Sequence, residues 1–397
     1  MYEIKIKSGD SLLIEDTKDY EKILKVLSEF GYEKWLDSER FSLKVPQGII
    51  GQIRFGRKRL EIVPSIKYLT VSDYLKLSFY IDDFDLEDTG LDYIEDPLLP
   101  NALVERFFET LKKLSSEGIP PKYVSKKKYM NYFAGNVNLT ESYVRNLIGR
   151  EPYVYTEIEE LSTEHEVVEV IKQAYEYVIG YDRRYFDGSL TALLSNVKNK
   201  NFLKSEIERI DSSFGSNERT LMTAFELAKK ILLNLSFVGG EGEGSPNILL
   251  NANDIFEKFV RGLLQSHLNN YSVRRPLKKK VTESDKNGKI LESRPDVLIA
   301  EPPFLTVLDV KNKNFDEYFA NQDFYQIYTY CKIYGASKGI LVYPSMFQTE
   351  TIKVIPIFEN NLNLYAVSIN ITGRNRRERL KRYEKFVREI KRIVDFI

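Results

Sequence analysis

The chain has 397 residues, of which 43% are hydrophobic and 29% charged, and its formal net charge is zero. This composition is typical of a globular protein of two or three domains, and no apolar run reaches the length of about 18 residues that a membrane span requires. The single cysteine, Cys331, excludes internal disulfides and cysteine-rich zinc sites, and together with an N-terminus unlike a signal peptide it predicts a cytoplasmic protein.

Residues 1–95 are predicted to form a strand-rich N-terminal domain. Apolar residues recur at helical spacing in Tyr20–Phe30, while Ile49–Phe55 and Leu60–Val63 have the pattern of two hairpin strands. The tip of this hairpin carries Arg57, Lys58 and Arg59. We expect the tip to project and to contact a partner protein, since a rigid hairpin loses little entropy on binding. The alternative is an ordinary solvated turn.

Residues 96–237 are predicted to be mainly helical, with Thr163 and Glu166 as the capping box of one helix. A glycine-rich linker follows at residues 238–246. Its two glutamates would repel a phosphate and no Gly-Lys-Ser/Thr follows it, so it is not a nucleotide-binding loop. Because no Walker A sequence occurs anywhere, the chain is not expected to hydrolyse nucleotides by the P-loop route.

Residues 247–397 alternate between predicted helices and strands. The first helix, Asn253–His267, carries Glu257. A basic strand, Tyr271–Val281, and a final basic helix, Arg374–Phe396, are candidates for contact with a DNA backbone, with ordinary solvation as the alternative. The residues expected to contact DNA in these two elements are Arg274, Arg275, Lys278, Arg376 and Arg377. Since the net charge is zero, affinity for nucleic acid has to come from such local patches.

The strongest chemical signal is a predicted hairpin of two strands, Val297–Ala300 and Phe304–Val310. Asp296 opens the first strand, and Asp309 and Lys311 close the second. Side chains alternate along a strand, so Asp309 and Lys311 point to the same face. Charged groups at the end of a buried strand are costly unless they have partners or a task. Carboxylate oxygens of this kind suit Mg²⁺, which is usually held by one or two carboxylates with phosphate and water.

A helix is predicted at residues 316–333, directly after this hairpin. Gln326 and Tyr330 are four residues apart and therefore lie on one helical face. The pair is a candidate for the same site. The alternative is an amphipathic helix whose tyrosines simply pack.

The order of Asp296, then Asp309-x-Lys311, resembles the signature of the PD-(D/E)xK nucleases. The pair Gln326-x-x-x-Tyr330 resembles a motif of the RecB-like branch of that superfamily. This resemblance implies a C-terminal domain with a restriction-endonuclease-like mixed sheet flanked by helices, within a mixed α/β chain.

With the N-terminal hairpin and Phe256-Glu257 in the same order, the chain resembles McrC proteins, the nuclease subunits of McrBC modification-dependent restriction systems. The resemblance implies a partner, McrB, an AAA+ GTPase that forms a hexameric ring. It also implies that the N-terminal region docks on that ring and that the partner recognises methylated cytosine. The family's usual Asp-x-Lys-Tyr-Lys has Asn312 in place of the tyrosine here, while Lys313 is kept.

The expected activity is Mg²⁺-dependent hydrolysis of double-stranded DNA, with Mn²⁺ as a substitute metal. Lys311 is expected to orient the attacking water and to stabilise charge on the phosphoryl oxygens. Gln326 would position Lys311 or the phosphate, and Tyr330 and Lys313 would contact the DNA. The expected catalytic residues are Asp296, Asp309, Lys311, Gln326, Glu257 and Tyr330. The expected metal ligands are Asp296, Asp309, the Val310 carbonyl and Glu257.

Two other functions stay open from the sequence. The chain could be a scaffold that stimulates a ring NTPase and has a degenerate nuclease fold, although the intact Asp296, Asp309 and Lys311 argue against it. It could also be a stand-alone repair nuclease of the RecB-like kind. The long N-terminal two-thirds without helicase motifs make that less favoured.

Overall fold

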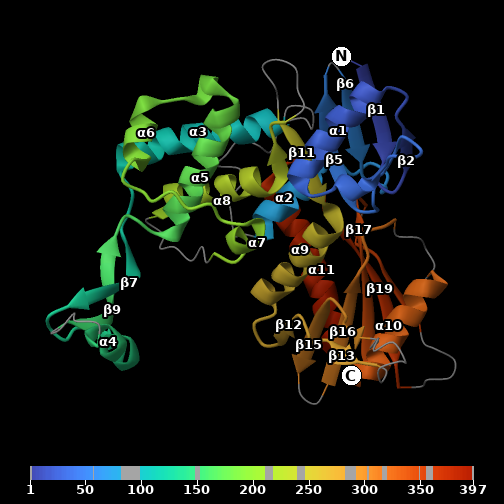
Figure 1. Ribbon diagram of the computed structural model, residues 1–397. Helices are drawn as coiled ribbons and strands as arrows, with labels where there is room; N and C mark the ends of the chain where they lie inside the picture. Colours follow the sequence, from blue (N-terminus) through green and yellow to red (C-terminus); the bar gives the residue numbers. More distant parts are fainter. Residues whose placement is uncertain are drawn as a thin grey trace. The chain divides into compact units, whose positions relative to one another are not determined.

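The computed structural model describes residues 2–56, 58–81, 99–147, 153–210, 218–238, 246–281, 292–301, 304–314, 320–347, 349–354 and 361–395. The chain is mixed α/β, as the sequence predicts. It divides into two compact units, Met1–Ala102 with Asn234–Ile397 and Leu103–Leu233 (Figure 1). Within the described residues, no helix has both the length and the apolar character needed to cross a membrane.

The first sheet of the larger unit is five-stranded, in the order β1-β6-β5-β11-β10. Its strands are β1 Tyr2–Lys7, β6 Lys58–Val63, β5 Ile49–Phe55, β11 Asn247–Asn251 and β10 Leu235–Ser236. β1 runs parallel to β6, and the other pairs are antiparallel. Helix α1, Thr17–Phe30, packs its apolar stripe on this sheet. The predicted hairpin is confirmed as β5 and β6, and both are inner strands.

Gly51 explains how β11 can lie so close to β5. Its φ is +140°, and a Cβ added there would lie 2.0 Å from the Ile248 carbonyl oxygen, so only glycine fits. A small three-stranded sheet belongs to the same unit and is formed by β2 Ser11–Leu13, β4 Ser42–Lys44 and β3 Leu36–Asp37. The short 3-10 helix η1, Glu33–Trp35, leads into β3.

The second sheet is six-stranded, in the order β12-β15-β16-β17-β19-β18. Its strands are β12 Ser272–Arg274, β15 Val297–Glu301, β16 Phe304–Val310, β17 Lys338–Ser345, β19 Asn363–Asn370 and β18 Thr351–Val354. β16, β17 and β19 are parallel to one another, and the remaining pairs are antiparallel. The carboxyl ends of the three parallel strands therefore meet at one edge of the sheet.

Four helices surround this second sheet. They are α10 Asn321–Tyr334, α9 Ala252–His267, α11 Arg376–Asp395 and α2 Val71–Ile81. α10 packs Ile327 and Cys331 against the core of the sheet. α9 and α11 contact the sheet and each other, and α2 packs on α9. The ring of Tyr80 in α2 lies 5.4 Å from that of Phe259 and 5.3 Å from that of Tyr383, so aromatic contacts join the three helices.

Some predicted elements of this unit have different bounds in the structure. The basic strand predicted at Tyr271–Val281 is two short strands, β12 and β13 Lys279–Lys280, the second paired with β14 Glu292–Ser293. Pro276 lies between them and cannot donate a ladder hydrogen bond. The helix predicted from residue 316 begins at Asn321, and residues 315–319 lie outside the described residues. The final helix begins at Arg376 instead of Arg374.

The smaller unit combines helices with a strand pair. Its helices are α5 Glu166–Tyr181, η5 Arg183–Tyr185, α6 Gly188–Leu194, α7 Lys204–Ile207 and α8 Arg219–Asn234, and α3 Leu99–Glu117 runs into it. The capping box predicted at Thr163 is wrong, because the N-cap of α5 is His165, which makes no side-chain cap hydrogen bond. The prediction of a mainly helical region also missed a long hairpin that precedes α5.

That hairpin consists of β7 Lys122–Met130 and β9 Val154–Ser162, which pair antiparallel along nine residues each. The short strand β8, Asn136–Val137, joins the same sheet, and helix α4, Leu139–Asn146, packs on β9. We call residues 122–162 the arm. Figure 1 labels its β7, β9 and α4.

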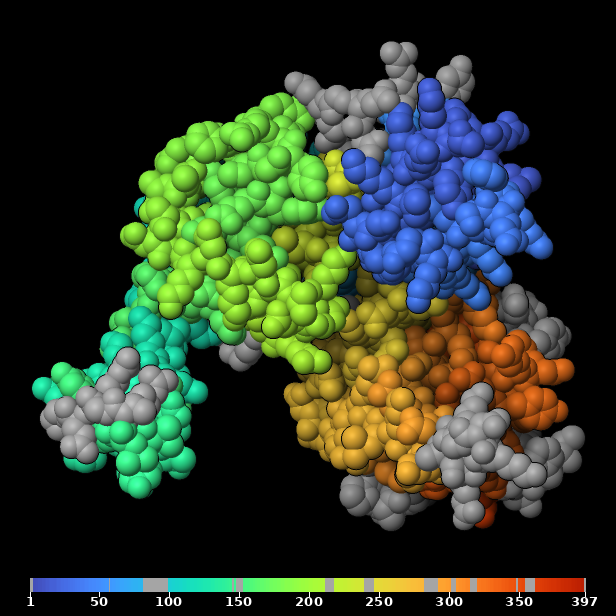
Figure 2. Space-filling model, in the orientation of Figure 1, coloured from blue at the N-terminus to red at the C-terminus, as the bar shows by residue number. Residues whose placement is uncertain are grey.

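The predicted linker at 238–246 lies between β10 and β11, and residues 239–245 are outside the described residues. The two strands on either side are antiparallel neighbours in the first sheet. The predicted C-terminal domain begins at residue 247 and so includes β11. In the structure, β11 pairs with β5 of the first sheet. Figure 2 shows the surface of the N-terminal residues in blue and that of the C-terminal residues in orange, and both belong to the larger unit.

Candidate active site

A polar cleft of about 610 Å³ lies where β16 ends. All the residues predicted to act in catalysis or metal binding line it: Asp296, Asp309, Val310, Lys311, Gln326, Tyr330 and Glu257. The wall is completed by residues from the first sheet and its neighbourhood, including Gln47 and Asn251. The cleft therefore draws on both sheets of the larger unit.

The pairing of β15 with β16 brings the two predicted carboxylates together. Val297 is paired with Leu308, so Asp296 and Asp309 flank the same rung of the ladder. The backbone N–H of Val310 donates to Asp296 Oδ2 at 2.7 Å. Asp309 is only 3% exposed. Both carboxylates are thus positioned by backbone that the sheet makes rigid.

The electrostatics of the pair suit a cation. Burial, together with the nearby negative charge of Asp309, raises the pKa of Asp296 to about 7. Burial also raises the pKa of Asp309, and the Lys311 ammonium partly offsets this. Two buried carboxyl groups that disfavour each other's charge are stabilised when a metal ion neutralises both.

The donor set fits magnesium better than a metal that needs a full protein cage. Among the described residues, no group of three or more His, Cys, Asp or Glu side chains is arranged to hold a metal ion. Asp296, Asp309 and the Val310 carbonyl offer oxygen atoms only. Mg²⁺ keeps several waters and binds through one or two carboxylates plus substrate phosphate, so this set is sufficient for it.

Lys311 belongs to a chain of polar contacts that crosses from β16 to α10. Its Nζ lies 2.6 Å from Asp309 Oδ2 and donates to Gln326 Oε1 at 2.7 Å. Gln326 Nε2 in turn donates to Tyr330 Oη at 2.9 Å. The helix that presents Gln326 and Tyr330 ends at Gly335, whose φ of +70° is the left-handed cap that glycine favours. Because Gln326 and Tyr330 lie four residues apart on one helical face, Tyr330 orients Gln326, and Gln326 holds the Lys311 ammonium in the cleft.

Asn312, which stands where the McrC-like motif usually has a tyrosine, has partners that the sequence did not indicate. Tyr74 Oη of α2 donates to Asn312 Oδ1 at 2.5 Å. Asn312 Nδ2 donates to Asn253 Oδ1 of α9 at 2.9 Å. Burial raises the pKa of Tyr74 well above its usual range, which keeps the phenol protonated as a donor. No spacing signal could have found Tyr74, since it lies in the N-terminal part of the sequence.

Glu257 lines the cleft, but its carboxylate already has cationic partners. Arg261 Nη1 donates to Glu257 Oε1 at 2.7 Å, and Arg275 Nη2 lies 3.1 Å from the same oxygen. Lys258, the sequence neighbour of Glu257, pairs with Asp254 instead. In this arrangement Glu257 orders two arginines, and one of them is Arg275, which the sequence predicts to contact DNA.

Lys313 has a partner inside the cleft as well. Its Nζ lies 2.5 Å from Asp323 Oδ2, and Tyr343 Oη donates to the same oxygen at 2.8 Å. Asp323 is 3% exposed. Asp323 therefore fixes Lys313, just as Gln326, one helical turn farther along α10, fixes Lys311.

The other residues predicted to contact DNA lie outside the cleft lining. Lys278 Nζ lies 3.0 Å from Glu292 Oε2. Arg274 is exposed on β12, and Arg376 and Arg377 are exposed at the start of α11. The structure brings none of these four to the metal-ligand candidates.

The predicted partner-binding tip differs from the expected projecting hairpin. Lys58 Nζ lies 2.6 Å from Asp19 Oδ2, and Arg59 forms an ion pair with Glu3. Arg57 lies outside the described residues. β6 is flanked by β1 as well as β5, so two of the three cations pair with their own sheet and its helix.

Comparisons with known proteins identify the family. A family model described as "McrBC 5-methylcytosine restriction system component" matches residues 45–344. No curated protein sequence matches the chain. A solved half-complex from a tetradecameric assembly of Thermococcus gammatolerans McrB AAA+ hexamers with bound McrC contains a chain with TM-score 0.56 and 15% identity, covering 99% of this chain and 100% of that chain.

A second match is to the Thermococcus gammatolerans McrBC complex, with TM-score 0.34 and 17% identity, covering 67% of this chain and 88% of that chain. At such identities, the likeness to the half-complex is one of fold. The family model, in contrast, spans well over half of the 397 residues. The chain therefore belongs to the family of McrBC 5-methylcytosine restriction system components.

Proposed function

We propose that this chain is the Mg²⁺-dependent DNA endonuclease subunit of a McrBC-type restriction system. The observation that carries the proposal is the convergence of Asp296, Asp309 and Lys311 in one cleft, with Lys311 held by Gln326. This is the set of groups that a PD-(D/E)xK nuclease uses. Membership of the restriction-system family supports the same activity.

The residues have separate tasks in the proposed reaction. Asp296, Asp309 and the Val310 carbonyl would hold Mg²⁺, which when bound polarises the phosphate and lowers the pKa of water. Lys311 places its ammonium beside Asp309, where it stabilises negative charge that develops on the phosphoryl oxygens. Gln326 keeps Lys311 there by accepting its hydrogen bond, and Tyr330 holds the amide of Gln326 in the matching orientation.

The test is an Asp309→Asn variant assayed for cleavage of methylated plasmid DNA with its partner present. Asparagine keeps the shape but removes the charge that a metal needs, so cleavage is expected to fall by at least about 100-fold. The partner's GTPase is measured in the same samples. Loss of cleavage with normal GTPase stimulation supports the nuclease. Normal Mg²⁺-dependent cleavage by the variant would instead favour the scaffold function with a degenerate nuclease fold.

We also propose that an AAA+ GTPase ring is the partner of this chain. The solved relative of similar fold is bound to McrB AAA+ hexamers. The absence of a Walker A sequence means that the P-loop motor has to come from another protein. A stand-alone repair nuclease would not need such a partner, so a pull-down from the native host that recovers no AAA+ protein would favour that alternative.

The arm is the better candidate for the partner contact than the hairpin tip. It carries large exposed apolar side chains: Tyr123, Tyr132, Phe133, Leu139, Tyr143, Val144, Leu147, Tyr153 and Leu161. Phe133 alone is 78% exposed. A concentration of exposed apolar groups of this kind marks a protein interaction site. The cations Lys58 and Arg59, in contrast, already have internal partners.

A further inference from the structure

A second, basic cleft of about 950 Å³ lies at the start of α11 in the larger unit. We propose that it holds the phosphate backbone of the DNA strand a few nucleotides from the scissile bond, with Tyr68 as an aromatic surface beside it. The proposal rests on the DNA-cleaving function proposed above. The residues that carry it are Arg374, Arg377, Lys381, Arg382 and Tyr68, all of which line the cleft.

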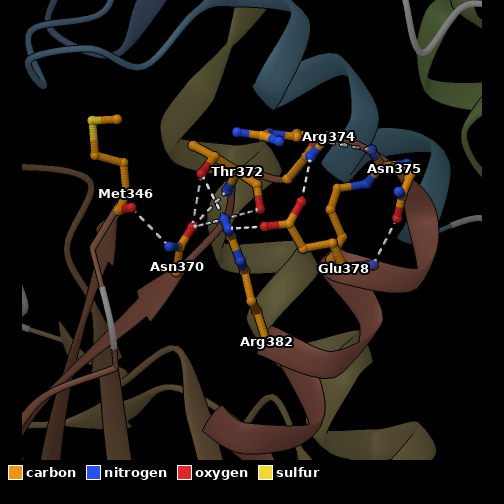
Figure 3. A network of polar contacts seen from close by, with 9 residues as sticks. Met346, Asn370, Thr372, Arg374, Asn375, Glu378 and Arg382 are labelled. Atoms are coloured by element: carbon orange, nitrogen blue, oxygen red, sulfur yellow. Dashed lines mark hydrogen bonds and ion pairs between the residues drawn. The ribbon is translucent and has the colours of Figure 1, made fainter.

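The floor of the cleft is held rigid by one arginine (Figure 3). Arg382 Nη1 donates to Asn370 Oδ1 at 2.9 Å, to the Thr372 carbonyl at 2.7 Å and to Thr372 Oγ1 at 2.9 Å. Asn370 Nδ2 also donates to the Met346 carbonyl at 2.7 Å. These bonds tie the end of β19 to the end of β17 and to α11. The segment after β19 is therefore preorganised, which lowers the entropy cost of binding a ligand.

Cations outnumber acids in the lining of the cleft, four (Arg374, Arg377, Lys381 and Arg382) to two (Asp73 and Glu378), so its net charge is positive. Glu378 pairs with Arg382 and accepts a hydrogen bond from the Arg374 backbone N–H at 2.9 Å. Asp73 accepts from the Thr70 backbone N–H at 3.0 Å and from Thr70 Oγ1 at 2.9 Å. Among the described residues, the structure gives the side chains of Arg374, Arg377 and Lys381 no hydrogen-bond or ion-pair partner, and all three are exposed. Three such cations on one wall favour a polyanion.

Tyr68 has a backbone conformation that is unusual for its type. Its φ is +70°, and it is the third residue of a turn closed by a 3.3 Å hydrogen bond from the Leu69 N–H to the Ile66 carbonyl. Glycine is favoured at such a position. The ring is 61% exposed, and Lys67 Nζ lies 4.7 Å from its centroid. This strained, exposed aromatic residue in a basic cleft is the surface that we assign to packing against the DNA strand.

The position of the cleft relative to the active site matches one DNA strand. Asp309 lies at the end of β16, and Asn370 ends β19, two strands away in the same parallel set. In the ladder Asp309 is level with Leu341 and Ala366, and Asn370 lies four residues farther along β19. With about 4.8 Å between adjacent strands and a rise of about 3.3 Å per residue, the two positions are about 16 Å apart. With a rise of about 3.4 Å per nucleotide in one strand, this separation corresponds to about five nucleotides.

Helix α2 joins the two sites. Tyr74 in its first turn reaches Asn312 in the active-site cleft, whereas Tyr68 and Asp73 line the basic cleft. A strand that follows the carboxyl edge of the sheet would therefore meet the catalytic groups first and the three cations next.

The test compares a triple variant, Arg374→Ala, Arg377→Ala and Lys381→Ala, with a matched control, Lys385→Ala, Arg388→Ala and Lys391→Ala. The control removes the same charge from exposed positions farther along α11. Binding of a labelled DNA duplex is measured with Ca²⁺ in place of Mg²⁺, at several salt concentrations. Removing one cation that neutralises a phosphate lowers the slope of log Kobs against log salt by about 0.9. We expect the triple variant to lower it by about 2 to 3 and the control to change it by less than about 1.

Tyr68 gives an independent readout. Tyr68→Phe should bind DNA like the wild type, whereas Tyr68→Ala should weaken binding by about 10-fold or more, as expected when an aromatic stacking surface is removed. Equal effects of the triple variant and the control on the salt slope, or no effect of Tyr68→Ala, would overturn the proposal. So would a triple variant that loses binding of labelled GTP while keeping its DNA affinity, since the cleft would then bind a free nucleotide.

The position of the basic cleft along the DNA is tested with a series of duplexes. Each carries one neutral methylphosphonate linkage, and its position is moved by one nucleotide from one duplex to the next. In the wild type, binding should fall most when the neutral linkage lies about five nucleotides from the cut. The triple variant should be insensitive to the linkage at that position and keep its sensitivity at the scissile phosphate. If the wild type binds no DNA at any salt concentration even with its partner present, the nuclease function fails; if binding is seen but the triple variant matches the wild type, only the basic cleft fails.

Discussion

At the scale of single residues, the active-site cleft holds two carboxyl groups whose charges oppose each other. Folding raises the pKa of Asp296 from 3.8 to about 7. The folded state therefore binds this proton more tightly than the unfolded state does. The stability that the proton contributes is complete below about pH 4 and is lost as the pH rises through about 7.

Asp296→Asn is accordingly expected to stabilise the metal-free protein at alkaline pH. Asparagine keeps an oxygen for the Val310 N–H but carries no charge. At pH 8 in EDTA, its free energy of unfolding should exceed that of the wild type by roughly 1 to 3 kcal/mol, and by much less at pH 4. Denaturant unfolding at the two pH values measures the difference. Adding Mg²⁺ at pH 8 should stabilise the wild type alone, and a variant that is less stable in EDTA at pH 8 contradicts the expectation.

Gln326 is expected to act as a positioning residue through Lys311. Gln326→Ala removes the acceptor that holds the ammonium, so the single-turnover cleavage rate should fall by about 10- to 100-fold while Mg²⁺ affinity stays unchanged. Tyr330→Phe removes only the hydroxyl that accepts from Gln326 Nε2, so it should lower the cleavage rate by less. As a control, Tyr325→Phe changes an exposed tyrosine of the same helix. Equal rates for Gln326→Ala and Tyr325→Phe would show that Lys311 needs no such support.

The residues of the site could be predicted where they are close in sequence. Asp296, Asp309 and Lys311 lie on two consecutive strands, and Gln326 and Tyr330 lie on the next helix, so spacing and strand alternation place them together. Tyr74 and Asn253 reach the same cleft through tertiary packing. Their contribution depends on how α2 packs on α9, which no local pattern specifies.

At the scale of secondary structure, the apolar strand β16 was predicted and the strand β7 was missed. β16 has the bounds expected from its apolar run. β7, in contrast, has the sequence Lys-Tyr-Val-Ser-Lys-Lys-Lys-Tyr-Met, with no buried residue in it. Its partner is β9, more than twenty residues farther along the chain. A strand held by a pairing of this kind, instead of by a core, leaves no hydrophobic periodicity in the sequence.

The exposed apolar side chains of the arm lead to a prediction for partner binding. The variant Phe133→Ser, Leu139→Ser and Tyr143→Ser should lower affinity for the AAA+ partner by more than about 10-fold, because exposed aromatic and leucine side chains provide apolar anchors for an interface. The measurement is co-elution with the partner and stimulation of its GTPase. Charge reversal at Lys58 and Arg59 is the comparison: if it abolishes stimulation while the arm variant does not, the hairpin tip is the docking surface.

At the scale of the whole molecule, catalysis and energy supply are predicted to lie on different chains. The isolated protein should bind GTP and ATP with no measurable affinity up to about 1 mM, because the sequence has no loop that cradles phosphates. Isothermal titration or a labelled nucleotide measures this. The isolated protein should also cleave DNA only weakly when the partner is absent. Micromolar nucleotide affinity of the purified chain would contradict this division.

The packing of β11 between β5 and β10 limits how the C-terminal sheet could be exchanged during evolution. A cut in the glycine-rich segment would leave the N-terminal sheet without an inner strand and would expose the backbone edge of β5. It would also remove Tyr74 from Asn312. Gene fusion or recombination at this junction would therefore yield two halves that each expose an unpaired surface. We therefore expect the two sheets to be inherited together and to change in step.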